Sequence, residues 1–382
     1  MPAYHAHAAQ RPLQPALPKG SLVVITGATG FIGSHTASAL LAHPNNYRIR
    51  CPVRSEEKAA GLTSYVEKHF GKGRLETPLV KDMAAPGAYE GIIDDDVKGV
   101  IHLATDVSFG ETWEVIENSK AGIENLLHTI SKHPSVTRLV LTSSSVALGQ
   151  PSSVPRSKFD PAHPAKVWDH DTWDDEMPTF ARQQADKQAK GEETDKTPGK
   201  LPMAMYATSK ILSERAAWEW LEDTKRSNNL TFTTVHPNAT LGEPILPKGA
   251  ASIPGEWLWS LYKGETATYD SASPQHFCNV RDIAKAHVAA IARDDVGNER
   301  ILGFTGPFGW SDCTRVLIRD FPDKKGIIAA PKEGDEDTID ATLVKNARFK
   351  ELCGGSLIGF EESVRETIQG QIKSGAKQDT KA

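Results

Sequence analysis

Short apolar runs alternate with longer helix-like stretches between residue 21 and residue 236. The runs at 21–26, 47–53, 97–104, 138–144 and 230–236 have the length and the composition of buried strands. In the stretches at 31–43, 112–132 and 206–225, apolar residues recur with the period of a helix. Strands that alternate with helices are typical of a parallel sheet covered on both faces. The pattern therefore predicts an α/β fold with a Rossmann-type, doubly wound parallel sheet.

Two regions depart from this alternation. Segment 181–200 has no apolar side chain larger than alanine except Pro198, so we expect an exposed insertion that buries too little surface to offset ordering. After Pro237 the strand pattern fades, and a helical stretch follows at 281–292. We expect a flexible N-terminal tail over residues 1–20 and a Rossmann domain over residues 21–236 and 276–305. A smaller, mostly C-terminal substrate-binding lobe should take up residues 237–275 and 306–382.

Composition narrows the class of protein. The chain has 382 residues, 39% of them apolar, which is enough for a packed core. The net charge is −5 without a long basic block, so nucleic acid and membrane are not expected partners. Four isolated cysteines indicate reduced thiols in a cytoplasmic protein. The pair His5 and His7 lacks further ligands nearby, and we expect no metal site.

The segment TGATGFIG places Gly27, Gly30 and Gly33 between the first apolar run and the first helix. In this context the first glycine allows a sharp turn, and the second lets the backbone approach a pyrophosphate. The third lets the helix pack closely on the strand. The helix N-terminus then offers free amides and a positive dipole end to the phosphates. The loop predicts a dinucleotide-binding site.

The choice between NAD and NADP depends on a position roughly 20 residues further on, where a carboxylate would bind the adenosine ribose. Here the chain reads PVRSEEK, with Arg54 in the place of the acid and Lys58 one helical turn later. Two cations suit a 2′-phosphate, which a guanidinium binds through two hydrogen bonds. We therefore expect NADPH or NADP rather than NAD.

Tyr206 and Lys210 form a Y-x-x-x-K pair at the start of the helical stretch 206–225. Residues four apart share a helix face, so the ammonium should lower the pKa of the phenol from about 10 toward neutrality. Ser143, Ser144 and Ser145 end the apolar run at 138–144, at the carboxyl edge of the sheet, where open α/β sheets bind ligands. A hydroxyl there can donate to a substrate carbonyl while Tyr206 delivers a proton.

Together these segments resemble the extended short-chain dehydrogenase/reductase family, and within it the microbial carbonyl reductases and the dihydroflavonol and cinnamoyl-CoA reductases. The resemblance covers nearly all of the chain after residue 20 and rests on TGATGFIG, VIHLA, Asn118 ahead of GIENLL, LTSS, YATSK, VHPNATLG and HFCNVRDIAKAHVAA. It implies NADPH-dependent reduction of an aldehyde or ketone to an alcohol by hydride transfer, with a tyrosine as general acid.

The resemblance also implies roles for single residues. Ser144 matches the catalytic serine, with Ser145 as the alternative, Tyr206 is the general acid, and Lys210 is its partner. The implied cofactor-binding residues come from the loop, the 2′-phosphate site, the adenine site, the strand VIHLA, the catalytic pair and the nicotinamide site: Gly27, Thr29, Gly30, Phe31, Ile32 and Gly33; Arg54 and Lys58; Asp82 and Met83; Ala104; Tyr206 and Lys210; Pro237 and Asn238.

Other functions stay open at this point. A nucleotide-sugar epimerase or a hydroxysteroid dehydrogenase would use the same fold, whereas a dehydratase would need Thr-Asp-Glu where this chain has Thr-Ser-Ser. A non-catalytic NADP-sensing protein would keep the glycine loop without needing Ser, Tyr and Lys together. We expect a small-molecule carbonyl as substrate and a monomer or homodimer. The aromatic residues of the second lobe either line its pocket or form its core: Trp257, Trp259, Tyr262 and Phe277.

Overall fold

The computed structural model describes residues 14–105, 109–223, 229–246 and 252–374. Its centre is a parallel sheet of seven strands, and the neighbours follow the order β11-β8-β5-β4-β1-β2-β3. The strands span Leu22–Thr26 (β1), Arg48–Arg50 (β2), Leu75–Glu76 (β3), Val97–His102 (β4), Arg138–Thr142 (β5), Thr231–Pro237 (β8) and Glu299–Gly303 (β11). The order reverses between β1 and β4, which is where doubly wound sheets open a ligand crevice. The predicted fold class is confirmed.

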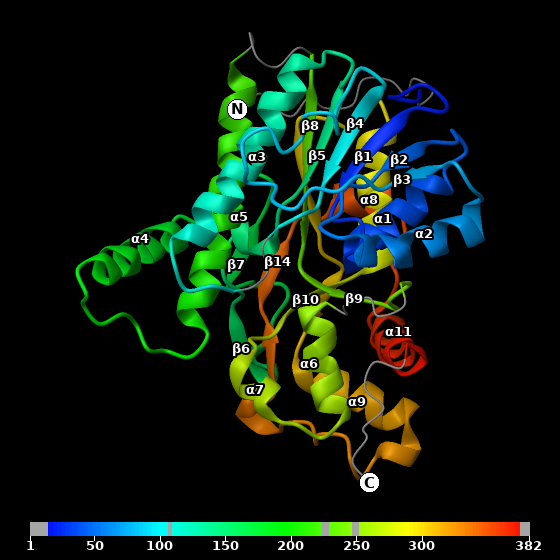
Figure 1. Cartoon of the computed structure of the whole chain (residues 1–382). Helices are drawn as coiled ribbons and strands as arrows, with labels where there is room; N and C mark the ends of the chain where they lie inside the picture. Colours follow the sequence, from blue (N-terminus) through cyan, green and yellow to red (C-terminus); the bar gives the residue numbers. More distant parts are fainter. Residues whose placement is uncertain (1–13, 106–108, 224–228, 247–251, 375–382) are drawn as a thin grey trace.

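Helices cover both faces of this sheet (Figure 1). Val23 and Ile25 of β1 pack with one group of helices, and Leu22 and Val24 pack with the other, because successive strand residues point to opposite faces. The first group is α1 (Phe31–Leu41), α2 (Glu56–Phe70), α8 (Val280–Ala292) and α10 (Ala347–Leu352). The second is α3 (Glu114–Lys132) and α5 (Lys200–Glu222).

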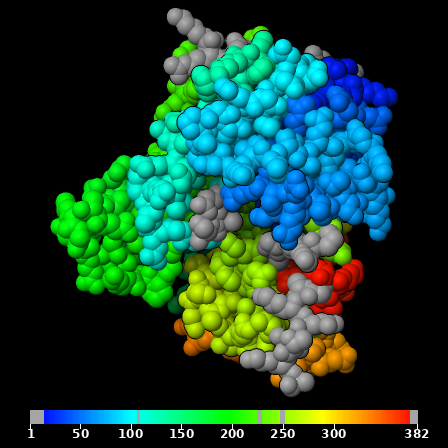
Figure 2. Space-filling view, viewed as in Figure 1, coloured from blue at the N-terminus to red at the C-terminus, as the bar shows by residue number. Residues whose placement is uncertain are grey.

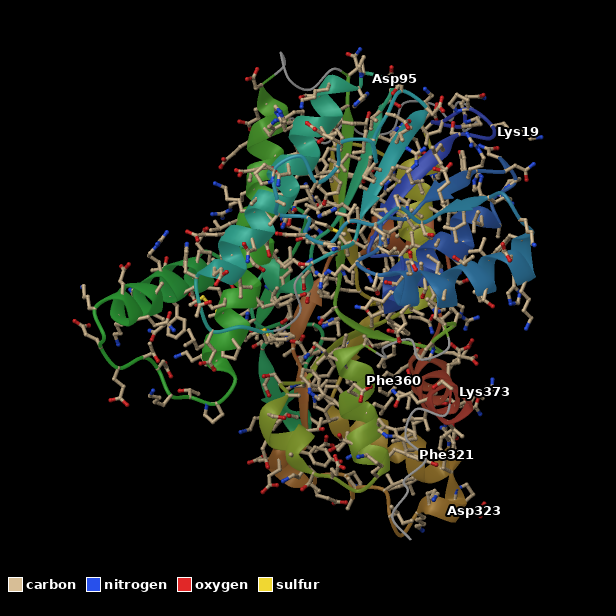
Figure 3. All side chains as sticks on the ribbon, in the orientation of Figure 1. Lys19, Asp95, Phe321, Asp323, Phe360 and Lys373 are labelled. Atoms are coloured by element: carbon tan, nitrogen blue, oxygen red, sulfur yellow. The ribbon has the colours of Figure 1, made fainter. Side chains whose placement is uncertain are left out.

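A smaller lobe lies at the carboxyl end of the large sheet. In Figure 3, Lys19 and Asp95, which precede β1 and β4, mark the amino end, whereas Phe321 and Phe360 lie at the opposite end of the molecule. The lobe contains a three-stranded sheet of β9 (Ala239–Leu241), β10 (Gln275–Asn279) and β12 (Gly306–Phe308). Its helices are α6 (Ile253–Tyr262), α7 (Ala267–Ser271), α9 (Trp310–Asp320) and α11 (Phe360–Lys373).

Two short strand pairs connect the middle of the chain with this lobe. They are β6 (Ser153–Pro155) with β13 (Thr338–Asp340), and β7 (Lys166–Trp168) with β14 (Thr342–Val344). The domain bounds expected from the sequence place residues 153–168 in the Rossmann domain and a boundary at residue 276. In the structure, β6 and β7 pair with C-terminal strands, and β10 belongs to the small sheet through Asn279.

The prediction that the N-terminal segment is a flexible tail does not hold for residues 14–20. Leu17 is 1% exposed and packs in the cluster that contains Val23 and Ile25, and the Ala16 amide donates a 2.8 Å hydrogen bond to the Ala292 carbonyl. Burial of one leucine side chain stabilises the folded state by about 1.5–3 kcal/mol, and the backbone hydrogen bond adds to this attachment of the segment. Residues 1–13, with His5 and His7, lie outside the described residues.

The segment 181–200 is more ordered than its composition predicts. Its first part belongs to helix α4 (Glu176–Ala189), which projects beside α3 in the space-filling view (Figure 2). Ala181 is fully buried against α5, and Met177 and Phe180 pack in the same cluster. The prediction failed because a small alanine lets two helices approach closely, and because the larger apolar residues lie just before the segment. Residues 190–200 are mostly exposed, as predicted.

Candidate active site

The glycine loop joins β1 to α1. Gly27 has a φ of +71°, and a Cβ on it would lie 2.8 Å from the Ala104 amide nitrogen at the end of the neighbouring strand β4. A Cβ on Gly33 would lie 2.1 Å from the Gly27 carbonyl oxygen, so only glycine lets the helix pack this closely on the turn. No side chain caps α1 at Gly30. The first amides of the helix, in Phe31 and Ile32, therefore have no partner within the helix and suit an anion.

A cavity of about 190 Å³ lies where the strand order reverses. It brings together residues from six separate parts of the chain, and the lining includes Arg54, Asp82, Met83, Ala104 and Lys210. Asn118 and Gly122 of α3 also line it. Five residues singled out from the sequence for cofactor binding therefore share one cavity.

The two cations expected at a 2′-phosphate both lie at the start of α2. Arg54 and Lys58 have exposed side chains, and no described residue forms an ion pair with either. Ser55 caps the helix by accepting a hydrogen bond from the Lys58 amide at 3.4 Å. Only Arg54 reaches the lining of the cavity; Lys58 does not.

The loop that carries Asp82 and Met83 is held from α3. The Asn125 side chain donates to the carbonyl oxygens of Met83, Ala84 and Ala85 at 3.4, 2.8 and 3.0 Å. Asp82 accepts a 2.9 Å bond from the Ala84 amide. Asn125 was not predicted from the sequence, because a lone polar residue on a helix gives no sign of the loop that it binds.

Tyr206 lies in the second turn of α5 rather than at its start, since the helix begins at Lys200. Its ring packs at 5.0 Å from that of Phe109, and its hydroxyl interacts with the side chain of Ser144. Burial raises the pKa of Tyr206 above its usual value, and the hydrogen bond with Ser144 offsets only part of this rise. This direction is opposite to the lowering that we expected from Lys210, because burial of the phenol is the largest cause of the change. The phenol keeps its proton at neutral pH.

Lys210 is buried, with 7% of its surface exposed. Its ammonium donates a 3.0 Å hydrogen bond to the carbonyl oxygen of Thr142, the last residue of β5. Burial lowers the pKa of Lys210 to about 8, and the carboxylate of Glu214, one turn further along α5, opposes this change.

The three serines after β5 have different surroundings. Ser143 donates a 2.6 Å hydrogen bond to the buried carboxylate of Glu214. Ser144 interacts with Tyr206 and accepts a 3.4 Å bond from the Val146 amide. Ser145 begins the short 3₁₀ helix η1 (Ser145–Ala147). Ser144 is the one that reaches the phenol.

Glu214 is a residue that the sequence reasoning missed. Its side chain is fully buried and bonds to His236 and Arg300 in addition to Ser143. The signal was present, because a glutamate four residues after Lys210 lies on the same helix face as the Y-x-x-x-K pair.

Some expected residues lie outside the cavity lining. Pro237 ends β8, and the Asn238 side chain accepts a 2.8 Å bond from the Ala239 amide; neither lines the cavity. The aromatic residues of the second lobe belong to its core rather than to a pocket: Trp259, Tyr262 and Phe277 are 7%, 9% and 5% exposed, and Trp257 packs edge-to-face on Trp310. Of the two alternatives left open by the sequence, the structure therefore favours the core for these four residues.

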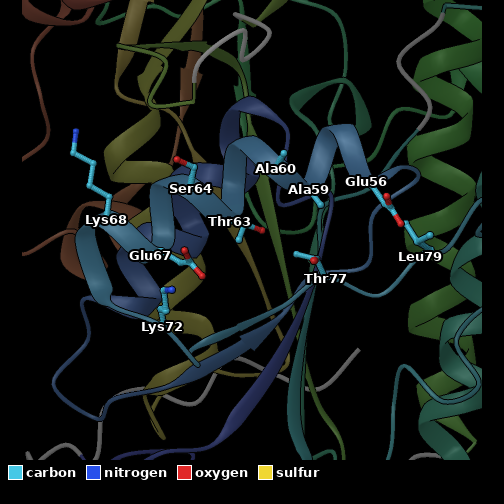
Figure 4. Close-up of a pocket in the computed structure, with 10 residues that line it drawn as sticks. All are labelled: Glu56, Ala59, Ala60, Thr63, Ser64, Glu67, Lys68, Lys72, Thr77 and Leu79. Carbon is cyan, nitrogen blue, oxygen red and sulfur yellow. The ribbon is translucent and has the colours of Figure 1, made fainter.

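A second hollow lies on the outer side of α2, beside β3, and is separate from this cavity (Figure 4). It has a volume of about 800 Å³, is widely open to solvent, and is lined by exposed side chains such as Glu67, Lys68 and Lys72. The two hollows share no lining residue. Lys210 and Ser143 line the cavity at the carboxyl edge of the sheet and do not line the second hollow.

Within the described part of the chain, all four cysteines are free and buried: Cys51, Cys278, Cys313 and Cys353. No helix of that part is both long enough and apolar enough to cross a membrane. No group of three or more His, Cys, Asp or Glu side chains among the described residues is arranged to hold a metal ion.

Comparison with known proteins agrees with this architecture. Residues 23–170 match the model of the NAD dependent epimerase/dehydratase family. Aldehyde reductase 2 of Sporidiobolus salmonicolor is 30% identical over 354 residues, which cover 92% of this chain and 96% of that protein. Ketoreductase adrE of Penicillium rubens is 33% identical over 340 residues, or 88% of this chain and 90% of that protein.

A solved structure of a reductase also resembles this chain over nearly its whole length. The crystal structure of yeast methylglyoxal/isovaleraldehyde reductase Gre2 with NADPH superposes with a TM-score of 0.73, at 26% identity, and covers 92% of this chain and 98% of that one. Because relatives at 30% identity or more align over nearly their whole length, the chain belongs to the NAD-dependent epimerase/dehydratase family, the extended short-chain dehydrogenases/reductases.

Proposed function

We propose that this protein reduces an aldehyde or ketone to an alcohol with NADPH. The observation that carries the proposal is the meeting of Ser144, Tyr206 and Lys210 at the carboxyl end of β5. Relatives named aldehyde reductase and ketoreductase align over at least 88% of this chain, and the Gre2 structure contains NADPH; these names support the same reaction class.

The residues present fit a phosphorylated dinucleotide. Gly27 lets the turn after β1 pack against the backbone of Ala104, and the uncapped start of α1 offers amides to a pyrophosphate. Arg54 has no protein partner among the described residues and would bind the 2′-phosphate, with Lys58 beside it. Asp82 and Met83 would contact the adenine. When bound, NADPH supplies the hydride.

The chain's own groups then act on the substrate oxygen. Tyr206 holds its proton at neutral pH and donates it to that oxygen. The Ser144 hydroxyl donates a second hydrogen bond to the same atom and stabilises the charge that develops there. Lys210, fixed by Thr142, keeps a positive charge at the base of the site. Ser145 is not needed in this account, because Ser144 already reaches the phenol.

The test is NADPH oxidation at 340 nm with a panel of aldehydes, α-ketoesters and aryl ketones. The account expects turnover with at least one class and a clear preference for NADPH over NADH. Absence of turnover across the panel, with tightly bound NAD found in the purified protein, would instead support an epimerase of the same fold. Binding of NADPH without any turnover would support an NADP-sensing protein. The proposed substrate is small, and the proposed location is the cytoplasm.

A further inference from the structure

A fully buried carboxylate lies directly behind the proposed active site. Glu214 has no exposed side-chain surface and accepts hydrogen bonds from five residues, which lie on β11, on β8, on α5 itself and just after β5. Its two oxygens accept from Arg300 Nε at 2.8 Å, Thr234 Oγ1 at 3.1 Å, His236 Nε2 at 2.9 and 3.1 Å, Trp218 Nε1 at 3.4 Å and Ser143 Oγ at 2.6 Å. The nearby Arg300 and His236 keep the pKa of Glu214 well below its usual range, although burial acts in the opposite direction.

The partners of Glu214 fix its position. Arg300 on β11 is 8% exposed, donates to the carbonyl oxygens of His170 and Thr172 at 2.9 and 2.6 Å, and stacks at 3.8 Å on the ring of Trp173. Thr234 and His236 both lie on β8, the strand between β11 and β5. Because a buried charge with several charge-assisted bonds has little freedom to move, the carboxylate is a rigid reference point inside the protein.

Ser143 is the only one of these donors, among the described residues, that lies next to a proposed catalytic residue. It follows the last residue of β5, and the backbone of Ser144 is extended, with φ −157° and ψ 157°. In an extended chain, successive side chains point to opposite sides. A Ser143 hydroxyl bound to Glu214 therefore directs the side chain of Ser144 away from Glu214 and toward Tyr206, where it interacts with the phenol.

We infer that Glu214 is a positioning residue: through Ser143 it sets the direction in which Ser144 faces the substrate carbonyl. This inference rests on the proposed reduction. Glu214 touches neither substrate nor cofactor and acts only through its neighbours. Replacing it directly would leave the charge of Arg300 buried without a counter-ion and would unfold the protein, so the sharper test removes single hydroxyl groups.

The test compares Ser143→Ala with the matched control Thr234→Val. Each substitution deletes one hydroxyl that donates to the same carboxylate, but Thr234 lies in the middle of β8, and its hydroxyl donates to Glu214. Ser143→Ala should lower kcat roughly 10- to 100-fold, the effect of a misplaced catalytic group, with NADPH Kd nearly unchanged. Thr234→Val should keep kcat within a factor of about two, and similar falls in Tm would show that both variants lose a comparable bond.

A double-mutant cycle with Ser144→Ala completes the test. If Ser143 acts through Ser144, Ser143→Ala should have almost no effect on kcat when Ser144 is already alanine. A full effect in that background, or equal kcat losses in Ser143→Ala and Thr234→Val, would overturn the inference and leave the proposed function in place. A wild-type protein that reduces no carbonyl would remove the proposed function, and the inference with it.

Discussion

The ammonium of Lys210 donates a 3.0 Å hydrogen bond to the carbonyl oxygen of Thr142. This bond joins the middle of α5 to the carboxyl end of β5, although the two residues are 68 positions apart in the chain. It holds the face of α5 that carries Tyr206 against the strand end that carries Ser144. The proposed catalytic groups therefore meet because this bond and the one from Ser143 to Glu214 hold α5 against the end of β5.

Reduction should weaken as the pH rises through about 8, because burial lowers the pKa of Lys210 to about 8 and the ammonium loses its proton there. Burial raises the pKa of Tyr206, so the phenol stays protonated across this range and does not produce the change. The measurement is kcat against pH with saturating NADPH. In Lys210→Arg, whose guanidinium does not titrate in this range, the alkaline fall should disappear. A wild-type profile that stays flat up to about pH 10 would exclude Lys210 as its cause.

Tyr206→Phe should lower kcat by roughly 10²- to 10⁴-fold, which is the usual contribution of a positioned general acid, with the NADPH Kd nearly unchanged. Steady-state kinetics and a fluorescence titration of NADPH measure the two quantities. Tyr65→Phe is the matched control, because it also removes a hydroxyl that has a hydrogen bond, here one between α2 and α1, with Ser38 at 3.0 Å. Equal activity in the two variants would remove Tyr206 from the mechanism.

Arg54→Ala should weaken NADPH binding about 10- to 100-fold, since a hydrogen bond to a charged group contributes roughly 1.5–3 kcal/mol. Binding of NADH should change little, because it has no 2′-phosphate. Titration of both cofactors by fluorescence checks this difference. Lys68→Ala, near the other end of α2, is the control and should affect neither cofactor. An equal loss of affinity for NADPH and NADH would mean that Arg54 does not bind the 2′-phosphate.

Gly33→Ala should destabilise the protein by about 1–3 kcal/mol, as overpacking of a tight contact does. The added Cβ would lie 2.1 Å from the Gly27 carbonyl oxygen. Gly61→Ala is the opposite case: it lies inside α2 with nothing within 4 Å of its added Cβ, so it should stabilise by up to about 1 kcal/mol. Urea unfolding of both variants gives the comparison, and similar free energies for the two would contradict the packing described at the loop.

Much of the fold could be predicted from the sequence because the buried parallel strands are continuous apolar runs. The runs at 97–104 and 138–144 become β4 and β5, and the glycine loop lies where its spacing predicts. Local patterns could not predict β6 and β7, because these three-residue strands pair with partners more than 170 residues later. The burial of Ala181 in α4 could not be predicted for a similar reason. Its side chain is small, and it becomes buried only because α5 packs against it.

For the candidate active site, the sequence could identify residues but not their surroundings. Spacing on one helix identified Tyr206 and Lys210, and both lie at the carboxyl end of β5. The direction of the Tyr206 pKa was wrong, because burial is a tertiary property that the four-residue spacing does not report. The distinction among the three serines also needed the structure, since it depends on the contact between Ser143 and Glu214.

The most direct test of the account follows the hydride itself. The protein is incubated with NADPH that carries deuterium at both C4 positions, and with the carbonyl compound that is reduced fastest in the panel. Mass spectrometry of the alcohol should find one deuterium on the carbinol carbon for every NADPH oxidised. An alcohol without deuterium at that carbon, or a panel in which no NADPH is consumed, would contradict the proposed carbonyl reduction.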